Sequence, residues 1–253
     1  MKGKVYLIDV TNRDGVQTSR ILLPKLSKTM LNIYLDEMGL FQSEIGFPTL
    51  KHEINYINAN LELVKLGAIK RTHLEGWCRA IPEDVRLSFK NCPELKHLNI
   101  SMSTSEIMIK GKFQGKRSFK DIIKSLIEAV KTARELGAET VGINAEDASR
   151  TELDRLIEFT LAGKEAGADR FRYCDTLGTD DPITIYERAK ALALATKFPL
   201  KCTAIMTSAW LRLYPLQGHR EREKWESTRI LIPRSTVTVS AAATVIWYQQ
   251  FSR

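Results

Sequence analysis

The stretch VYLIDVTNRDGVQ, residues 5–17, decides how the rest of the chain is interpreted. An apolar, β-branched run typical of a strand passes directly into a polar cluster that includes Arg13, Asp14 and Gln17. A strand that brings an arginine, a carboxylate and an amide to one place is typical of a catalytic rim. The alternative is an ordinary strand-end turn, in which Asp14 and Gly15 supply turn chemistry and Arg13 is solvated.

The composition is that of a globular protein. Of 253 residues, 43% are hydrophobic and 27% are charged, which is enough for one large domain or two small ones. The start of the chain lacks a signal-peptide pattern, and no apolar run approaches the roughly 18 residues that span a bilayer, so we expect a cytoplasmic protein without membrane association. Four scattered cysteines without a CxxC pair predict reduced, buried thiols, and the four histidines show no metal-ligand spacing.

Short β-branched runs alternate with amphipathic stretches along the chain, which predicts an α/β fold with a parallel sheet. Strands are expected at 5–11, 40–46, 71–77, 97–103, 139–145, 170–175 and 199–205. Helices are expected at 21–38, 52–66, 82–91, 118–136, 150–166 and 181–196. No glycine-rich phosphate loop follows the first strand, so a (β/α)8 TIM barrel is favoured over a doubly wound sheet. Six βα units and a seventh strand make that barrel incomplete.

The carboxyl ends of barrel strands meet on one face, where their side chains converge. Carboxylates and arginines dominate this set, which suits a divalent metal and a polyanionic substrate. An alternative is that Glu146 and Asp147 cap the following helix and that Glu75 is an ordinary salt-bridge partner. In chain order the set is Arg13, Asp14, Gln17, Glu44, Glu75, Arg79, Ser101, Ser103, Asn144, Glu146, Asp147, Arg150, Asp175 and Thr176.

Four motifs at successive strand ends carry a family resemblance: IDVTNRDGVQ, SEIGFP at 43–48, NAEDASRT at 144–151 and RYCDTLG at 172–178. Together they resemble the acyl-CoA-condensing TIM-barrel family of homocitrate synthase, 2-isopropylmalate synthase and related lyases, over residues 1–199. Within that family, the segments LPKLSKTMLNIYLDEMG and IKGKFQGK are most similar in sequence to the nitrogenase-associated homocitrate synthases. The resemblance implies condensation of acetyl-CoA, as co-substrate, with a 2-oxo acid, 2-oxoglutarate in the homocitrate type, followed by thioester hydrolysis. The alternative acceptors are those of 2-isopropylmalate or citramalate synthesis.

The resemblance also implies roles for individual residues. Asp14 is the family's position for a ligand of a divalent metal (Mg, Mn or Zn), and Arg13 would stabilise the enolate or alkoxide. Glu146 would transfer a proton or fix a water. Intact relatives are expected to be homodimers. Residues expected to contact the substrates are Gln17, Glu44, Arg79, Ser101, Ser103, Arg150 and Thr176.

The chain departs from the family pattern at two places. Many relatives have a histidine where this chain has Met108, so no role is assigned there. From residue 200, where the family has an HxH pair in a segment such as MHCHNDLGMA, the chain reads KCTAIMTSAW. Residues 200–253 hold eight Lys and Arg against three Glu, a balance of +5 that leaves +3 of the total +8 for the first 199 residues. Three of the four tryptophans also lie in this tail.

A frameshift would account for these departures. Residues 201–210 can be back-translated as AAA TGC ACT GCC ATA ATG ACC TCG GCA TGG, and reading from the third base gives MHCHNDLGM. In that frame, residues 214–218 permit VSIAG and residues 229–242 permit YINTTVNGYGERCG, which look like the family's next elements. We therefore divide the chain into a partial catalytic domain, 1–199, and an out-of-frame tail, 200–253, and expect an inactive enzyme as written.

The alternative is a genuine, divergent C-terminus, in which GHREREKWESTR forms a solvated helix and STVTVSAAATVIWY a strand. The chain would then be a non-catalytic remnant or a partner-binding fragment. A basic tail with tryptophans also permits nucleic-acid contacts, but no recognition motif accompanies the charge, so no nucleic-acid partner is expected. We expect residues 206–253 to be poorly ordered, which would leave the edge of the first strand exposed.

Overall fold

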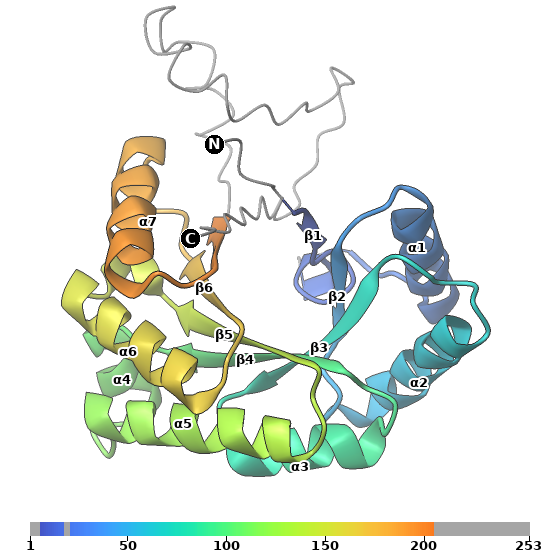
Figure 1. The fold of residues 1–253 in the computed structure, drawn as a ribbon, viewed down its shortest axis with the longest axis horizontal. Helices are drawn as coiled ribbons and strands as arrows, with labels where there is room; N and C mark the ends of the chain where they lie inside the picture. The colour runs from blue at the N-terminus through green and yellow to red at the C-terminus, as the bar shows by residue number, and fades with distance from the viewer. Residues whose placement is uncertain (1–5, 18–20, 205–253) are drawn as a thin grey trace, which may run out of the picture.

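The computed structural model describes residues 6–17 and 21–204, which form a curled sheet with helices along its outer side (Figure 1). All neighbouring strands are parallel, and the sheet order follows the chain order. This arrangement confirms the predicted α/β fold and the incomplete barrel. The strands are β1 (Ile8–Asp9), β2 (Gln42–Gly46), β3 (His73–Arg79), β4 (His97–Ser103), β5 (Thr140–Glu146), β6 (Arg170–Asp175) and β7 (Leu200–Ala204).

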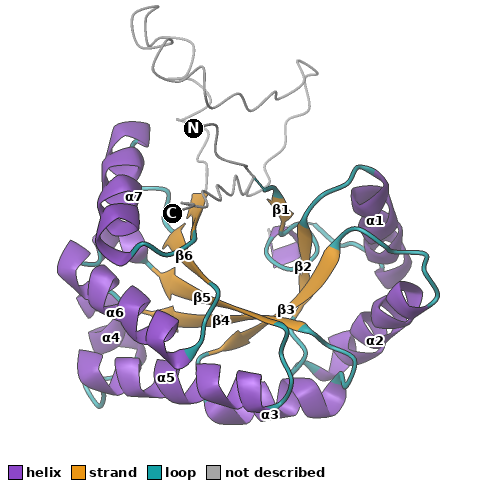
Figure 2. Ribbon diagram, viewed as in Figure 1, coloured by secondary structure: helices purple, strands orange, loops and turns teal. Residues whose placement is uncertain are grey.

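The helices cover the convex side of the sheet, and the strands line its concave side (Figure 2). Among residues 6–17 and 21–204, no helix has both the length and the apolar character needed to cross a bilayer. The helices are α1 (Lys25–Glu37), α2 (Lys51–Lys65), α3 (Pro82–Asn91), α4 (Glu106–Lys112), α5 (Phe119–Glu135), α6 (Leu153–Ala166) and α7 (Pro182–Thr196), with 3₁₀ turns at Gly15–Gln17 and Ala148–Arg150.

Helix α5 shows how local sequence forms these elements. Ser118 and Asp121 form a capping box at its start, because each side chain accepts from the other residue's backbone N–H. Apolar residues at helical spacing, among them Ile122, Leu126 and Val130, are buried against the sheet. Gly137, just after the helix, has φ +91°, a conformation that other residues adopt at a cost. The helix therefore has a start, a buried face and an end that the sequence specifies locally.

The two faces of the sheet have different compositions. On β4, Leu98 and Ile100 belong to the apolar core, whereas Asn99 and Ser101 bond to carboxylates of β2 and β5. Barrel interiors are usually filled by bulky branched side chains. Here the apolar core lies between the sheet and the helices, and polar side chains occupy the concave side.

Within the described residues, β1 pairs only with β2, and β7 pairs only with β6. The seven strands therefore form a curled sheet without a ladder that joins its two ends. The expectation that residues 206–253 are poorly ordered lies outside the described residues. The expected burial of the thiols is confirmed: Cys78, Cys92, Cys174 and Cys202 are free and buried.

Several predicted boundaries are wrong, each for a local reason. The first strand ends at Asp9 because the carbonyl of Val10 accepts the N–H groups of Arg13, Asp14 and Gly15 in a tight turn. The first helix begins at residue 25, since Pro24 restricts the residue before it to extended conformations. The helix expected at 150–166 is α6, which begins at residue 153, after a 3₁₀ turn. Helix α4 was not predicted.

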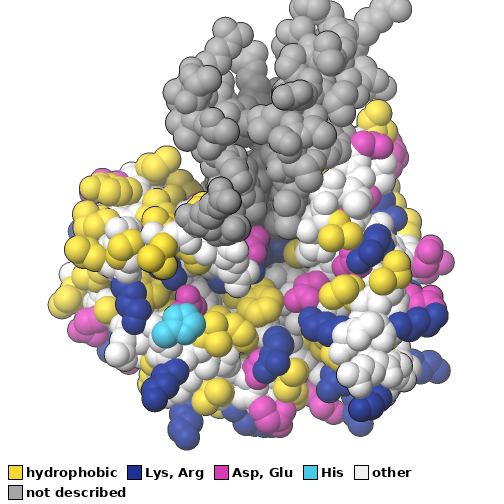
Figure 3. All heavy atoms as spheres, turned by 180° about the vertical axis from the view of Figure 1, so that it is seen from behind, with side chains coloured by type: hydrophobic (Ala, Val, Ile, Leu, Met, Phe, Trp, Pro, Cys, Tyr) yellow, Lys and Arg dark blue, Asp and Glu magenta, His cyan; other side chains and the backbone are white. Residues whose placement is uncertain are grey.

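Apolar side chains also gather on the outer surface over α1 (Figure 3). Leu26 is 73% exposed, Tyr34 is exposed on the same helix, and Met38 is exposed just after its end. Asn32 and Leu35 of α1 are buried. The helix therefore carries apolar surface beyond the face that it packs against the sheet.

We expect Gly163→Ala to destabilise the fold, because a methyl group at this position in α6 would overlap the Ile143 side chain of β5. Overpacking of this kind costs about 1–3 kcal/mol of unfolding free energy, measurable by urea denaturation. Gly111→Ala is the control, because nothing lies within 4 Å of a methyl group there and its helix should gain. Equal stability of the two variants would contradict the packing described for α6.

Candidate active site

The turn after β1 places Arg13 over the concave side of the sheet. Its Nε donates to Glu44 Oε1, and its Nη1 donates to Asp14 Oδ1 at 2.9 Å. The guanidinium also lies 5.1 Å from the ring centre of Trp77, a cation–π contact. A turn does form after the strand, as the alternative interpretation expected, but Arg13 is not solvated: it is directed inward, and its side chain is only 14% exposed.

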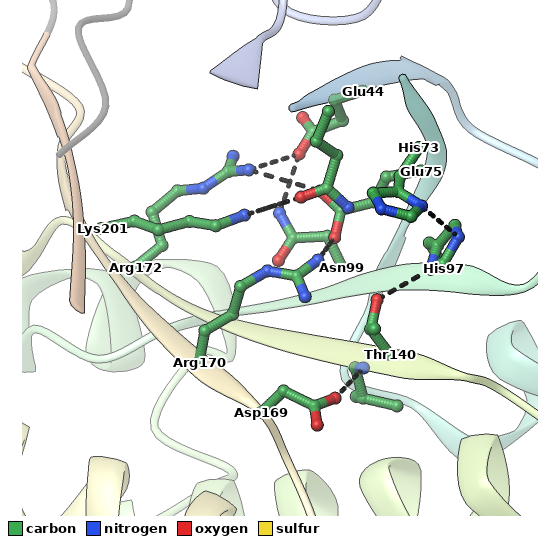
Figure 4. Close-up of polar contacts among 12 residues, drawn as sticks. Glu44, His73, Glu75, His97, Asn99, Thr140, Asp169, Arg170, Arg172 and Lys201 are labelled. Carbon is green, nitrogen blue, oxygen red and sulfur yellow. Dashed lines mark hydrogen bonds and ion pairs between the residues drawn. The ribbon is translucent and has the colours of Figure 1, made fainter. Parts of the chain in front are cut away.

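Glu44, at the centre of β2, is fully buried among donors from three other segments (Figure 4). Besides Arg13, its carboxylate accepts from Arg172 Nη2 of β6 and Asn99 Nδ2 of β4, each at 2.8 Å. Burial by itself raises the pKa of Glu44, but the charges of Arg13 and Arg172 outweigh it, so the pKa lies well below its usual range. Glu44 is therefore ionised and fixes the orientation of Arg13.

Glu75 of β3 lies beside this group and is also fully buried. It accepts from Arg170 Nη2, and its Oε2 lies 3.7 Å from Arg172 Nη2 and 3.8 Å from Lys201 Nζ (Figure 4). Burial, then the charge of Arg170, lowers the pKa of Lys201 well below its usual value. Glu75 is therefore a salt-bridge partner, as the alternative in the sequence analysis expected, and its partners lie across the concave side of the sheet.

Glu146, at the end of β5, is a partly buried carboxylate. It accepts from Ser101 Oγ at 2.9 Å, from Ser103 Oγ at 2.6 Å and from Lys112 Nζ at 3.1 Å. Burial raises its pKa, but the charge of Lys112 and the three hydrogen bonds outweigh that effect and lower the pKa overall. The carboxylate is therefore ionised at neutral pH, and its side chain remains 20% exposed.

The other predicted residues occupy different surroundings. Arg150 pairs with Asp147, whose carboxylate also accepts from Ser105. Arg79 forms a two-pronged ion pair with Asp84 of α3, at 2.6 and 2.9 Å, and its side chain is 55% exposed. Arg79 is thus directed toward a helix rather than toward Glu44. Thr176 follows β6 and is half-buried.

A cavity of about 200 Å³ opens beside Arg13. It extends to the residues that follow β2, to Trp77 of β3 and to the first turn of α2, and Gln17 borders it. Its lining is Arg13, Val16, Gln17, Phe47, Leu50, His52, Glu53 and Trp77. Charged, amide and aromatic side chains therefore surround this cavity.

The described residues do not form a complete metal site. In residues 6–17 and 21–204, no three His, Cys, Asp or Glu side chains are grouped so as to hold an ion. Asp14 has one carboxylate oxygen engaged by Arg13. Hard divalent cations need about six oxygen ligands, of which Asp14 offers at most two.

Several functional partners were missed in the sequence. Asn99, Arg172 and Lys201 lie inside predicted strands, and their inward direction is visible only once the strand register is known. Lys112 belongs to the unpredicted helix α4, for which Ser105 is the N-cap; a serine before a short run ending in lysines was the available signal. At the opposite end of the strands, His97 bonds to His73 and Thr140 (Figure 4).

Three curated proteins illustrate the relatives of this chain. It is 63% identical to citrate (Re)-synthase of Dehalococcoides mccartyi over 199 residues, 79% of this chain and 48% of that protein. It is 40% identical to 2-isopropylmalate synthase 2 of Caldanaerobacter subterraneus over 188 residues, 74% and 47% of the two chains. It is 31% identical to homocitrate synthase 1 of Nostoc over 199 residues, 79% and 50%. The chain spans about half the length of these relatives.

The homocitrate type is accordingly not supported specifically, since the citrate (Re)-synthase shares twice as many residues as the homocitrate synthase does. Solved structures agree on the fold. Hydroxymethylglutaryl-CoA lyase of Pseudomonas aeruginosa superposes with a TM-score of 0.65 at 16% identity, over 85% of this chain and 73% of that one.

We expect Glu44→Gln to lower the unfolding free energy by about 3 kcal/mol at pH 7, because it removes the buried counter-charge that Arg13 and Arg172 share and leaves each with one remaining carboxylate partner. A lowered pKa gives stability that is present above the unfolded-state pKa, about 4.3, and is lost as pH falls below it. The difference in unfolding free energy between wild type and variant should therefore shrink from pH 7 to pH 3.5, as urea denaturation can measure.

Glu106→Gln, at an exposed ion pair, is the control, and its unfolding free energy should differ little from that of wild type. A Glu44 variant as stable as wild type at pH 7 would contradict this account.

A sequence model of the HMGL-like family matches residues 4–206, most of the chain. The match contains the turn with Arg13, the buried carboxylates Glu44 and Glu75, and the β5 end with Glu146. Together with the curated relatives, it settles the family. The chain belongs to the HMGL-like family.

Proposed function

We propose that this chain carries the condensing site of a synthase that joins acetyl-CoA to oxaloacetate and releases citrate and CoA. The 63% identity to citrate (Re)-synthase is the observation that carries this proposal. Homocitrate synthesis, the more distant alternative, uses 2-oxoglutarate, which is longer by one methylene group. Both acceptors are 2-oxo dicarboxylates, and Arg13 at the edge of the cavity offers a guanidinium group that can pair with a carboxylate.

Arg13 supplies positive charge where negative charge develops. Its guanidinium borders the cavity, and Glu44 and Trp77 hold it from two sides. A fixed cation of this kind stabilises the enolate of acetyl-CoA, or the alkoxide formed on attack, by a few kcal/mol. Because Glu44 is itself held by Arg172 and Asn99, Arg13 needs no reorganisation during the reaction.

Glu146 is the proposed base. Its ionised carboxylate accepts a proton from the methyl group of acetyl-CoA, and the resulting carbanion attacks the carbonyl carbon of the oxo acid. Protonation of the alkoxide gives the citryl thioester, which water hydrolyses to citrate and CoA. Gln17 and Thr176 remain proposed contacts for the substrates, and Asp14 remains the proposed metal-ligand position.

We also propose that the reading frame changes near residue 200, so that 1–199 is the partial catalytic domain and 200–253 an out-of-frame tail. The family match ends at residue 206 and the similarity to citrate (Re)-synthase spans 199 residues, which supports this division. Sequencing the coding DNA around codon 200 tests it. A one-nucleotide change that restores MHCHNDLGM is expected; an intact frame would make the tail genuine and the chain a non-catalytic remnant.

The acceptor is tested with the frame-restored chain. We expect thiol release from acetyl-CoA, with Mn²⁺ or Mg²⁺ present, to show a kcat/KM for oxaloacetate at least about tenfold above that for 2-oxoglutarate, because one methylene is worth about 1–3 kcal/mol in a fitted pocket. Arg13→Lys should lower kcat by about a hundredfold, and Arg86→Lys, at an exposed ion pair, should not. A preference for 2-oxoglutarate would indicate homocitrate synthesis, and a preference for 2-oxoisovalerate or pyruvate would indicate 2-isopropylmalate or citramalate synthesis.

For the chain as written, we expect weak binding of divalent metal, since the described residues contain no group of three ligands. Titration calorimetry with Mn²⁺ should detect no site of micromolar affinity. The matched variants are Asp14→Ala and, at an exposed position on α6, Asp154→Ala. Tight binding that Asp14→Ala abolishes and Asp154→Ala preserves would contradict the expectation. The homodimer expected of intact relatives also remains a prediction, for light scattering.

A further inference from the structure

Lys112 makes a contact that none of the roles assigned above uses. It is the last residue of α4, and its Nζ lies 3.1 Å from Glu146 Oε2 and 3.0 Å from Ser103 Oγ. The Lys112 side chain is 43% exposed, so its ammonium group reaches the carboxylate from the open side of the site. A lysine that could extend into solvent is instead directed at the proposed base.

Helix α4 is fastened at its other end to the same segment of chain. Ser105 Oγ accepts the backbone N–H of Met108 at 3.2 Å and donates to the carboxylate of Asp147, the residue after Glu146. Asp147 is itself held by Arg150. Both ends of α4 therefore bond to consecutive residues at the end of β5, which fixes where Lys112 can reach.

We propose that Lys112 is a positioning residue for the condensation: it keeps Glu146 in the carboxylate form and fixes the direction of its oxygens. This proposal rests on the role given to Glu146 under the proposed function. Ser101 and Ser103 cannot replace Lys112, because a hydroxyl group orients a carboxylate but brings no positive charge.

The groups around Glu146 come from three elements. β4 contributes the hydroxyls of Ser101 and Ser103, α4 contributes Lys112, and β6 contributes Cys174. Burial raises the pKa of the Cys174 thiol to about 12, so this neighbour is neutral. Lys112 is the cation whose charge most strongly lowers the pKa of Glu146. Without it, the two serine hydrogen bonds alone would oppose the effect of burial, so the pKa of Glu146 would rise toward the protonated acid, which cannot accept a proton.

The test measures the ionisation of Glu146 directly in the full chain. The protein is labelled with ¹³C at glutamate side chains, and the carboxyl resonance of Glu146 is assigned by its loss in Glu146→Gln. Its chemical shift is then followed from pH 8 to the lowest pH at which the fold persists. The matched pair is Lys112→Met and Lys110→Met, since Lys110 lies on the same helix and pairs with Glu106 at the surface.

We expect Lys112→Met to raise the midpoint for Glu146 by at least about one pH unit, the effect of removing a contacting opposite charge. Lys110→Met should leave the midpoint unchanged, and Lys112→Arg should restore the wild-type value because it retains the cation. A backbone amide spectrum matching that of wild type shows that each variant is folded. Equal midpoints in Lys112→Met, Lys110→Met and wild type would overturn the proposal.

The titration needs no turnover, so it separates this proposal from the proposed function. Suppose that the midpoint shifts but the frame-restored protein condenses no 2-oxo acid. The proposed function, and with it the catalytic role of Lys112, would then be overturned. The effect of Lys112 on the ionisation of Glu146 would still be confirmed. An unshifted midpoint in an active enzyme would overturn the role of Lys112 alone. In the active form, Lys112→Met should lower kcat more at low pH than at high pH, and Lys112→Arg should reverse that pH dependence.

Discussion

Ion pairs across the concave side of the sheet are the interaction on which the rest of this structure depends. Glu44 and Glu75, on β2 and β3, meet Arg170 and Arg172 of β6. A buried charge that loses its partner costs several kcal/mol, so these four residues favour a sheet that curls until β2 and β3 face β6.

Two carboxylates on the concave side of the sheet, Glu44 and Glu146, have different surroundings. Glu44 is enclosed and held by guanidinium groups and an amide, so it serves as an anchor for Arg13. Glu146 lies at the strand ends, is held by hydroxyls and one lysine, and keeps part of its surface exposed. Both are ionised, but the Glu146 carboxylate itself is partly exposed, whereas that of Glu44 is fully enclosed. Because both residues are glutamates, it is the difference in burial that suits Glu44 to holding Arg13 and Glu146 to proton transfer.

Stability is supplied by the other side of the sheet. Leu98, Val141 and Phe159 belong to one apolar cluster between strands and helices. Two glycines make the layers fit. At Gly142, a methyl group would lie 2.5 Å from Asn99 Oδ1, and at Gly163 it would overlap Ile143. Gly142 therefore leaves room for the inward amide network, while Gly163 lets α6 approach β5 closely.

The sequence by itself determined the alternation of strands and helices, because hydrophobic period and turn residues are local signals. It also predicted that Arg13, Glu44 and Glu146 share one face of the sheet, because parallel βα units have a single face where strand ends meet; Glu44 in fact lies at the centre of β2, and Arg13 lies in the turn after β1. Only the tertiary structure decided which arginine turns inward. Arg79 pairs with Asp84, five residues away, whereas Arg172 pairs with Glu44, 128 residues away, through the curl of the whole sheet. Helix α4 and its Lys112 were not predicted either, because seven residues carry too weak a local helix signal. Contacts with the end of β5 hold this helix in place.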